Sequence, residues 1–130
     1  MLLDTSGLLC LLSKDEPEHA EAVSCYKAGT SRFVHNYILA EFIPLARVRG
    51  VSRIESLEFS RRMQNDRRVA MVWVTQETHQ TAMDLLFKRM DKAYSLCDAV
   101  SFVLMRERGM TEALTTDRHF EQEGFTRLLV

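Results

Sequence analysis

The sequence predicts an α/β fold in which a parallel sheet is covered by helices on both faces. Short apolar segments alternate with amphipathic helical segments along the chain, which is typical of a doubly wound sheet. The clearest apolar segment, residues 69–74, reads Val-Ala-Met-Val-Trp-Val, and such a run indicates a strand buried on both faces. With 130 residues and 46% apolar side chains, the chain is expected to form one domain over residues 1–130.

Five segments are expected to be strands and six to be helices, with no internal repeat and no linker between them. The expected strands are 1–3, 32–35, 69–74, 113–115 and 125–130. The expected helices are 6–12, 15–27, 36–50, one that begins at residue 52, 78–90 and 96–108.

Capping residues define the helices in the first part of the chain. A hydroxyl at Thr5 or Ser6 can accept hydrogen bonds from the free N–H groups that begin the first helix. Pro17 suits the first turn of the second helix, and Gly29 its end. Asn36 is the expected N-cap of the third helix.

The later helices have similar signals. Pro44 lies inside the third helix, where a kink is expected, and Ser52 with Glu55 forms a capping-box pattern for the fourth. The buried face of the fourth helix is expected to consist of Ile54, Leu57 and Met63. Gly109 closes the last long helix. The large side chains expected in the core are Phe33, Trp73, Phe87 and Phe102.

Composition excludes several classes of protein. No segment approaches the roughly 18 consecutive apolar residues of a membrane-spanning helix, and residues 1–3 lack the basic start of a secretory signal. The three cysteines are scattered and form no C-x-x-C pair, which fits a reducing cytoplasm and argues against structural zinc. The four histidines show no zinc-ligand spacing.

Arginines are concentrated in one region, although the net charge of the chain is only −1. Seven arginines lie between residues 47 and 68. They form either a solvated helix face or a surface for phosphates or an acidic partner, and the sequence leaves both readings open. The candidate RNA contacts are Arg47, Arg49, Arg61 and Arg62.

Four acidic residues stand where a parallel sheet would bring them together: Asp4, Glu41, Asp98 and Asp117. Asp4 and Asp117 directly follow predicted strands, and ligands of open α/β sheets bind at the carboxyl ends of strands. Two carboxylates about 4 Å apart repel by about 4 kcal/mol at an effective dielectric constant near 20. A fold that gathers four must protonate some of them or bind a cation, so a hard divalent cation is expected.

Four blocks of sequence around these acids occur in order. They are Leu3-Asp4-Thr5-Ser6, Asn36-Tyr37-Ile38-Leu39-Ala40-Glu41, Tyr94-Ser95-Leu96-Cys97-Asp98-Ala99-Val100-Ser101-Phe102 and Ala113-Leu114-Thr115-Thr116-Asp117-Arg118-His119-Phe120. In this pattern the chain resembles the PIN-domain ribonucleases, and among them the VapC-like toxins. The resemblance implies a three-layer α/β/α sandwich with a five-stranded parallel sheet and an acidic pocket for Mg²⁺ or Mn²⁺.

The resemblance also implies that the protein is a metal-dependent endoribonuclease and that it acts as the toxin of a type II toxin–antitoxin pair. Its catalytic acids fall on Asp4, Glu41, Asp98 and Asp117, of which Asp4, Asp98 and Asp117 are the expected metal ligands. The polar residues expected to support them fall on Ser6, Asn36 and Thr115. The partners that it implies are RNA, a small antitoxin whose arginine would enter the acidic groove, and a second copy of the chain.

The chain departs from the family pattern at two positions. Cys97 stands where the family often has Thr, and His119 where some members carry a further Asp. For His119 a surface or packing role is favoured over the role of a metal ligand, and both stay open. The departure at this position also leaves open a catalytically weak module that binds RNA or protein. Other acidic α/β folds fit less well, since a phosphatase of the haloacid-dehalogenase type needs D-x-D where this chain has Asp4-Thr5-Ser6.

Overall fold

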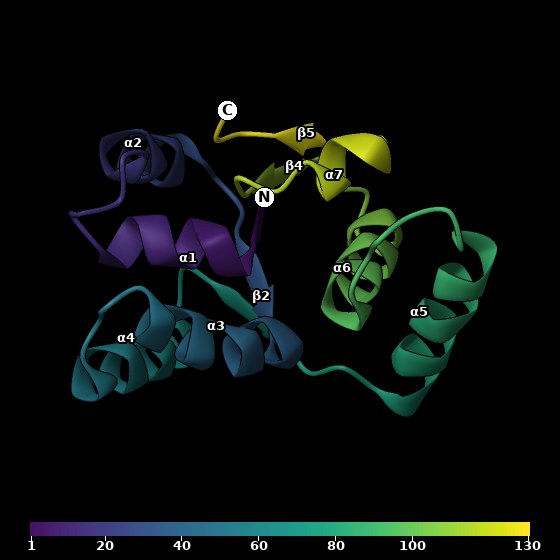
Figure 1. The fold of residues 1–130 in the computed structure, drawn as a ribbon, viewed down its shortest axis with the longest axis horizontal. Coiled ribbons are helices and arrows are strands. Elements are labelled where there is room, and N and C mark those ends of the chain that lie inside the picture. The colour runs from purple at the N-terminus through teal and green to yellow at the C-terminus, as the bar shows by residue number, and fades with distance from the viewer.

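Five parallel strands form the central sheet of the structure, a computed structural model that describes residues 1–130. The strands are β1 (Leu2–Leu3), β2 (Phe33–His35), β3 (Ala70–Val72), β4 (Glu112–Leu114) and β5 (Thr126–Arg127). They lie in the order β3-β2-β1-β4-β5, and every neighbouring pair is parallel. The predicted five-stranded parallel sheet is therefore confirmed (Figure 1).

Seven helices connect the strands. They are α1 (Thr5–Leu12), α2 (His19–Ala28), α3 (Asn36–Val48), α4 (Arg53–Asn65), α5 (Gln76–Lys88), α6 (Leu96–Glu107) and α7 (His119–Gln122). Helices α1 to α4 lie in the connections from β1 to β2 and from β2 to β3. Helices α5 to α7 lie in the connections from β3 to β4 and from β4 to β5. Because such crossovers are right-handed, the two groups cover opposite faces of the sheet. Figure 1 shows α1 to α4 on one side and α5 with α6 on the other, the predicted α/β/α sandwich.

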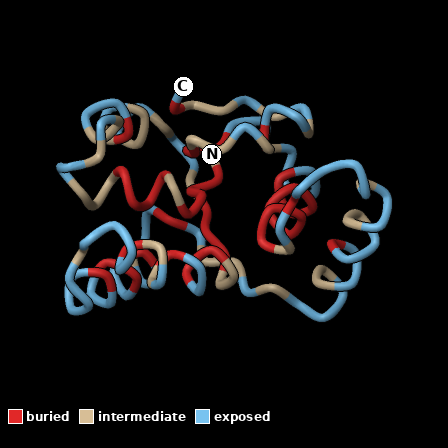
Figure 2. The backbone as a smooth tube through the Cα atoms, in the orientation of Figure 1, coloured by how far each residue is buried: buried red, intermediate tan, exposed pale blue.

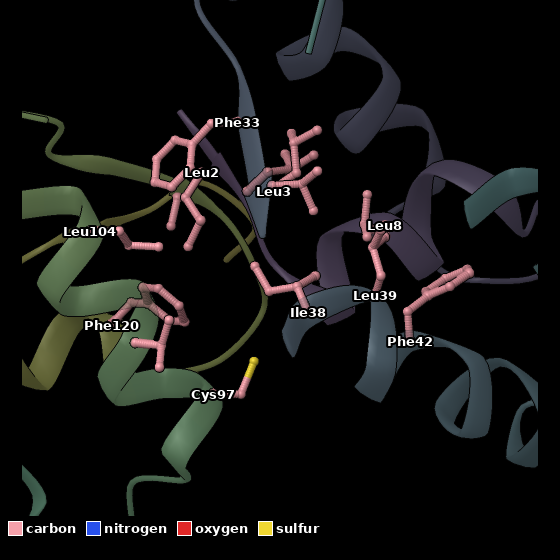
Figure 3. Packing of buried hydrophobic residues seen from close by; sticks show 14 of the residues in the cluster. Leu2, Leu3, Leu8, Phe33, Ile38, Leu39, Phe42, Cys97, Leu104 and Phe120 are labelled. Carbon is pink, nitrogen blue, oxygen red and sulfur yellow. The ribbon is translucent and has the colours of Figure 1, made fainter. Parts of the chain in front are cut away.

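The core lies on both faces of strands β1 and β2, every residue of which is buried (Figure 2). Consecutive strand residues point to opposite faces, so Leu2 packs with Phe33 and Leu104 while Leu3 lies toward Leu8 (Figure 3). Every residue of α6 from 97 to 105 is buried. This helix therefore holds the residue at its first turn, Asp98, in a rigid part of the molecule.

Strand β3 corrects one prediction about the core. The segment 69–74 was expected to be buried on both faces, yet only residues 70–72 are a strand and Trp73 is 59% exposed. The reason is the strand order, because β3 is the last strand of the sheet and pairs with β2 alone. An edge position lets apolar side chains beyond the strand reach solvent.

Two expected core faces on helices also differ. On α4, Met63 is buried as expected, but Ile54 and Leu57 are 62% and 37% exposed. The rest of the buried face of α4 consists of Ser56, Phe59 and Ser60. Phe87, near the end of α5, is 71% exposed. The expected helix at 15–27 begins only at His19, because residues 14–18 form turns.

The N-cap of α3 is His35 and not Asn36. His35 is fully buried, and its Nδ1 accepts a hydrogen bond from the backbone N–H of Ile38 at 3.3 Å. Since Nδ1 accepts, Nε2 carries the hydrogen and donates it to Ser101 Oγ at 2.8 Å. The imidazole thus joins β2, α3 and α6 in its neutral form. Burial lowers the pKa of His35 from 6.5 to about 3.

This buried imidazole predicts acid sensitivity of the fold. A histidine whose pKa is depressed in the folded state binds protons first in the unfolded state, so stability is lost as pH falls below 6.5. At about 1.4 kcal/mol for each pKa unit, we expect a loss of roughly 2 kcal/mol between pH 6.5 and pH 5. Urea unfolding at both pH values measures it.

The matched control is His35→Asn, since an asparagine can still cap α3 but does not titrate. All other groups titrate alike in both proteins, so the difference between their pH slopes isolates His35. Equal slopes in the two proteins would contradict the assignment.

Candidate metal centre

The four predicted acids line one cavity of about 580 Å³ at the carboxyl ends of the strands. Asp4 follows β1, Asp117 follows β4, Asp98 lies in the first turn of α6, and Glu41 lies on α3. The cavity also contains Thr5, Ser6, Pro44, Leu45, Ala93, Ser95, Thr116 and His119. Asp4 and Asp98 are only 5% and 7% exposed, whereas Glu41 stands at the exposed rim. The fold therefore brings together residues that are far apart in the sequence.

Thr115 links two of these acids. Its Oγ1 donates a hydrogen bond to Asp4 Oδ2 at 2.7 Å and accepts one from the backbone N–H of Asp117 at 3.0 Å. Because the hydroxyl hydrogen of Thr115 is used, Ser6 Oγ must donate to Thr115 Oγ1, at 3.1 Å. Ser6 Oγ also accepts from the backbone N–H of Thr116 at 3.0 Å. Ser6 and Thr115 thus join the start of α1 to the end of β4.

This joint requires a very close approach of α1 to β4. A Cβ on Gly7 would lie 2.0 Å from the carbonyl oxygen of Leu114. Such contact with a backbone atom is impossible without moving one of the two elements. Glycine at position 7 therefore permits the geometry in which Asp4 meets Thr115.

Asp98 is oriented from both sides. Its Oδ2 accepts from the backbone N–H of Ser95 at 3.0 Å, and Ser95 Oγ accepts from the backbone N–H of Asp98 at 3.0 Å, which completes a capping box. His119 Nδ1 lies 2.9 Å from the same Oδ2 and 3.5 Å from Asp117 Oδ2. Asp98 and Asp117 are thereby held facing one another across His119.

The cavity has a deficit of positive charge. No lysine or arginine forms an ion pair with any of the four acids, and His119 is their only basic neighbour at ion-pair distance. Burial, together with the charges of Asp98 and Asp117, raises the pKa of Asp4 from 3.8 to about 7. The same causes raise the pKa of Glu41. The donor set consists mainly of carboxylate oxygens, and a hard divalent cation fits it.

The sequence profile of the PIN domain family matches residues 1–125. The chain belongs to the PIN domain family. Comparison with curated protein sequences gives no match. Among solved structures, the chain is similar to the crystal structure of Mycobacterium tuberculosis VapC20, a toxin that cleaves the sarcin–ricin loop. The identity is 23%, the TM-score is 0.88, and the match covers 96% of this chain and 95% of that one. At this identity the likeness establishes the fold.

None of the helices of this PIN domain combines the length and the apolar composition that a bilayer-spanning helix requires.

Asn36 has a different place from the one expected. Its Oδ1 accepts a hydrogen bond from the backbone N–H of Val74 at 2.7 Å, so the side chain secures the end of β3. It forms no hydrogen bond with any of the four acids and does not line their cavity. The expectation that Asn36 supports the acids directly is therefore wrong.

His119 is the residue of this centre that sequence reasoning missed. It was expected at the surface or in packing, but it lies in the cavity with Nδ1 against two of the acids. Its place two residues after Asp117, where some family members carry Asp, was the available indication. Cys97 is buried, and its thiol lies beside the carboxyl group of Glu41. Burial first, and then that carboxylate, raises the pKa of Cys97 above its ordinary value.

The four candidate RNA-binding arginines lie outside the acidic cavity. Arg47 lines a neighbouring cavity that shares Pro44 with it. Arg49 is paired with Glu16 at 2.7 Å, and the guanidinium group of Arg62 lies 5.8 Å from the ring centre of Phe59. Arg61 is exposed. Of the four arginines, Arg47 is therefore the one that lines a cavity adjoining the acidic site.

Proposed function

We propose that this PIN domain is a metal-dependent endoribonuclease that hydrolyses RNA phosphodiester bonds as the toxin of a type II toxin–antitoxin pair. The observation that carries the proposal is the single cavity in which four acids meet without a lysine or arginine partner. Membership of the PIN family and the fold shared with a sarcin–ricin-loop-cleaving toxin support it.

Each residue of the cavity has a proposed role. Asp4, Asp98 and Asp117 would hold Mg²⁺ or Mn²⁺, and a cation bound there would supply an acidified water and stabilise charge on the phosphate. Glu41, at the rim, would orient the attacking water by a hydrogen bond. Thr115 and Ser6 keep Asp4 and Asp117 at a fixed separation through their hydrogen bonds.

The proposed partners follow from the same charges. RNA would approach along the side of the cavity that carries Arg47, with Arg61 as a second phosphate contact. A small antitoxin could block the cavity by inserting an arginine, since a guanidinium group pairs well with two carboxylates. We further propose that the protein is a homodimer in the cytoplasm, where its three free cysteines would stay reduced.

The test is RNA cleavage by the purified protein with Mn²⁺, with Mg²⁺ and with EDTA. We expect internal cleavage of a structured ribosomal RNA fragment in the presence of either metal, complete loss in EDTA, and recovery when excess metal is added. Cleavage that persists in EDTA would contradict a metal centre. Binding of Mn²⁺ and RNA without any cleavage would instead favour the non-catalytic binding module.

A further inference from the structure

One nitrogen atom lies among the carboxylate oxygens of the acidic cavity. His119 Nδ1 and one oxygen each from Asp98 and Asp117 all lie within 4.8 Å of one another. We propose that His119 Nδ1 is itself a ligand of the divalent cation, and that the mixed nitrogen–oxygen site selects Mn²⁺ over Mg²⁺. This inference rests on the metal-dependent function proposed above and identifies its cation.

The ring of His119 is held in the orientation that a ligand needs. Its backbone N–H donates to Asp117 Oδ1 at 2.9 Å, which fixes the residue against that acid. The ring meets Tyr94 edge to face, with 5.3 Å between ring centres. The Tyr94 hydroxyl in turn donates to Glu123 Oε1 at 3.1 Å. The side chain of His119 is only 27% exposed.

Glu123 makes this support rigid. Its side chain is 3% exposed and is paired with Arg89 at 3.0 Å and with Arg106 at 2.6 Å. The chain of contacts from Glu123 through Tyr94 restricts the motion of the imidazole, so that Nδ1 stays toward the two acids. A ligand fixed in this way loses little rotational freedom when it binds a cation.

The hydrogen on the imidazole decides whether Nδ1 can bind. Without a cation, Nδ1–H donates to Asp98 Oδ2 at 2.9 Å. A neutral imidazole has a single N–H, and when Nε2 carries it the lone pair of Nδ1 faces Asp98 and Asp117. In that tautomer Nδ1 could bind a cation in place of its hydrogen bond to Asp98.

A nitrogen ligand changes which metal is preferred. Mg²⁺ is bound almost entirely by oxygen and water in octahedral geometry, whereas imidazole suits first-row transition metals. Mn²⁺ accepts both carboxylate and imidazole ligands. Replacing His119 by Asp would restore a set made only of oxygens, so the affinity ratio of Mn²⁺ to Mg²⁺ should fall by about 10-fold or more.

The experiment compares wild type, His119→Asp and His119→Asn by titration calorimetry with Mn²⁺ and with Mg²⁺ alone. Pulsed electron paramagnetic resonance of bound Mn²⁺ then reports nitrogen directly. We expect imidazole ¹⁴N coupling in the wild type and none in either variant, together with the fall in the metal ratio for His119→Asp. The matched control is His79→Gln, because His79 lies outside the cavity. Its Nδ1 is hydrogen-bonded to the hydroxyl group of Tyr37 at 2.6 Å.

The outcomes separate this inference from the proposed function. Wild-type protein that binds Mn²⁺ without ¹⁴N coupling would overturn the role of His119 and leave the metal-dependent nuclease intact. Wild-type protein that binds no Mn²⁺ would overturn both. The spectrum of the wild type decides the question even where a variant fails to fold.

Discussion

Asp98→Asn is expected to abolish metal-dependent RNA cleavage while the fold remains intact. The change removes a cation-binding charge worth several kcal/mol in the transition state, which corresponds to a fall in rate of at least about 1,000-fold. The amide oxygen of Asn can still accept from the backbone N–H of Ser95, so the capping box at the start of α6 survives. Cleavage rates and circular dichroism of the same preparation measure the two effects.

Asp4→Asn should abolish cleavage equally, but with a second effect that distinguishes it from Asp98→Asn. Burial raises the pKa of Asp4 to about 7, so above pH 7 the folded state carries a charge that the unfolded state holds more easily in water. Removing that charge should stabilise the metal-free protein by about 4 kcal/mol at pH 8, at about 1.4 kcal/mol for each pKa unit. The Asn oxygen can still accept from Thr115.

Denaturant unfolding of the metal-free proteins at pH 8 tests the stabilisation. An active Asp4→Asn and an active Asp98→Asn would together rule out the proposed centre. A loss of activity accompanied by unfolding would instead assign these residues to the structure of the domain.

Gly7→Ala is expected to be the most destabilising of the substitutions considered. The added Cβ would lie 2.0 Å from the Leu114 carbonyl oxygen and 2.7 Å from its carbonyl carbon, so α1 must move away from β4. Overpacking against a well-packed core costs typically about 1–3 kcal/mol, and here the atoms met belong to the backbone, so we expect about 3 kcal/mol. The movement also separates Asp4 from Thr115, so cleavage should fall in the fraction that still folds.

A second glycine provides the control. Gly109 has a positive φ of 64° but has no atom within 4 Å of an added Cβ. Gly109→Ala should therefore cost only the backbone strain, about 1 kcal/mol. Both values come from urea unfolding at one pH. Equal losses in the two variants would show that contact with β4 is not what position 7 requires.

The fold could be predicted from sequence because its evidence is periodic and local. Apolar segments ending in Asp4 and Asp117 indicated both the strands and the edge of the sheet where ligands bind. The exposure of Trp73 could not be predicted, because an apolar run shows that a strand exists but not whether it has one neighbour or two. The choice of His35 over Asn36 as N-cap likewise depended on Ser101, a partner distant in the sequence.

The candidate site shows the same division. Acids directly after strands could be placed, since the chain path alone brings them to one edge. His119 could not, because its role depends on a ring orientation set by Tyr94 and by an ion cluster around Glu123. Side-chain orientation of this kind comes from packing, which no spacing pattern encodes.

The strand order has a consequence for synthesis of the protein. Strand β1 lies between β2 and β4, and the two acids that follow β1 and β4 are Asp4 and Asp117. Asp4 is synthesised first, but it cannot meet Asp117 until nearly all of the domain has been translated. Partial products that stop before β4 lack half of the acid pair that Thr115 joins. The acidic cavity of a growing polypeptide therefore stays incomplete until the segment that follows β4 has been synthesised.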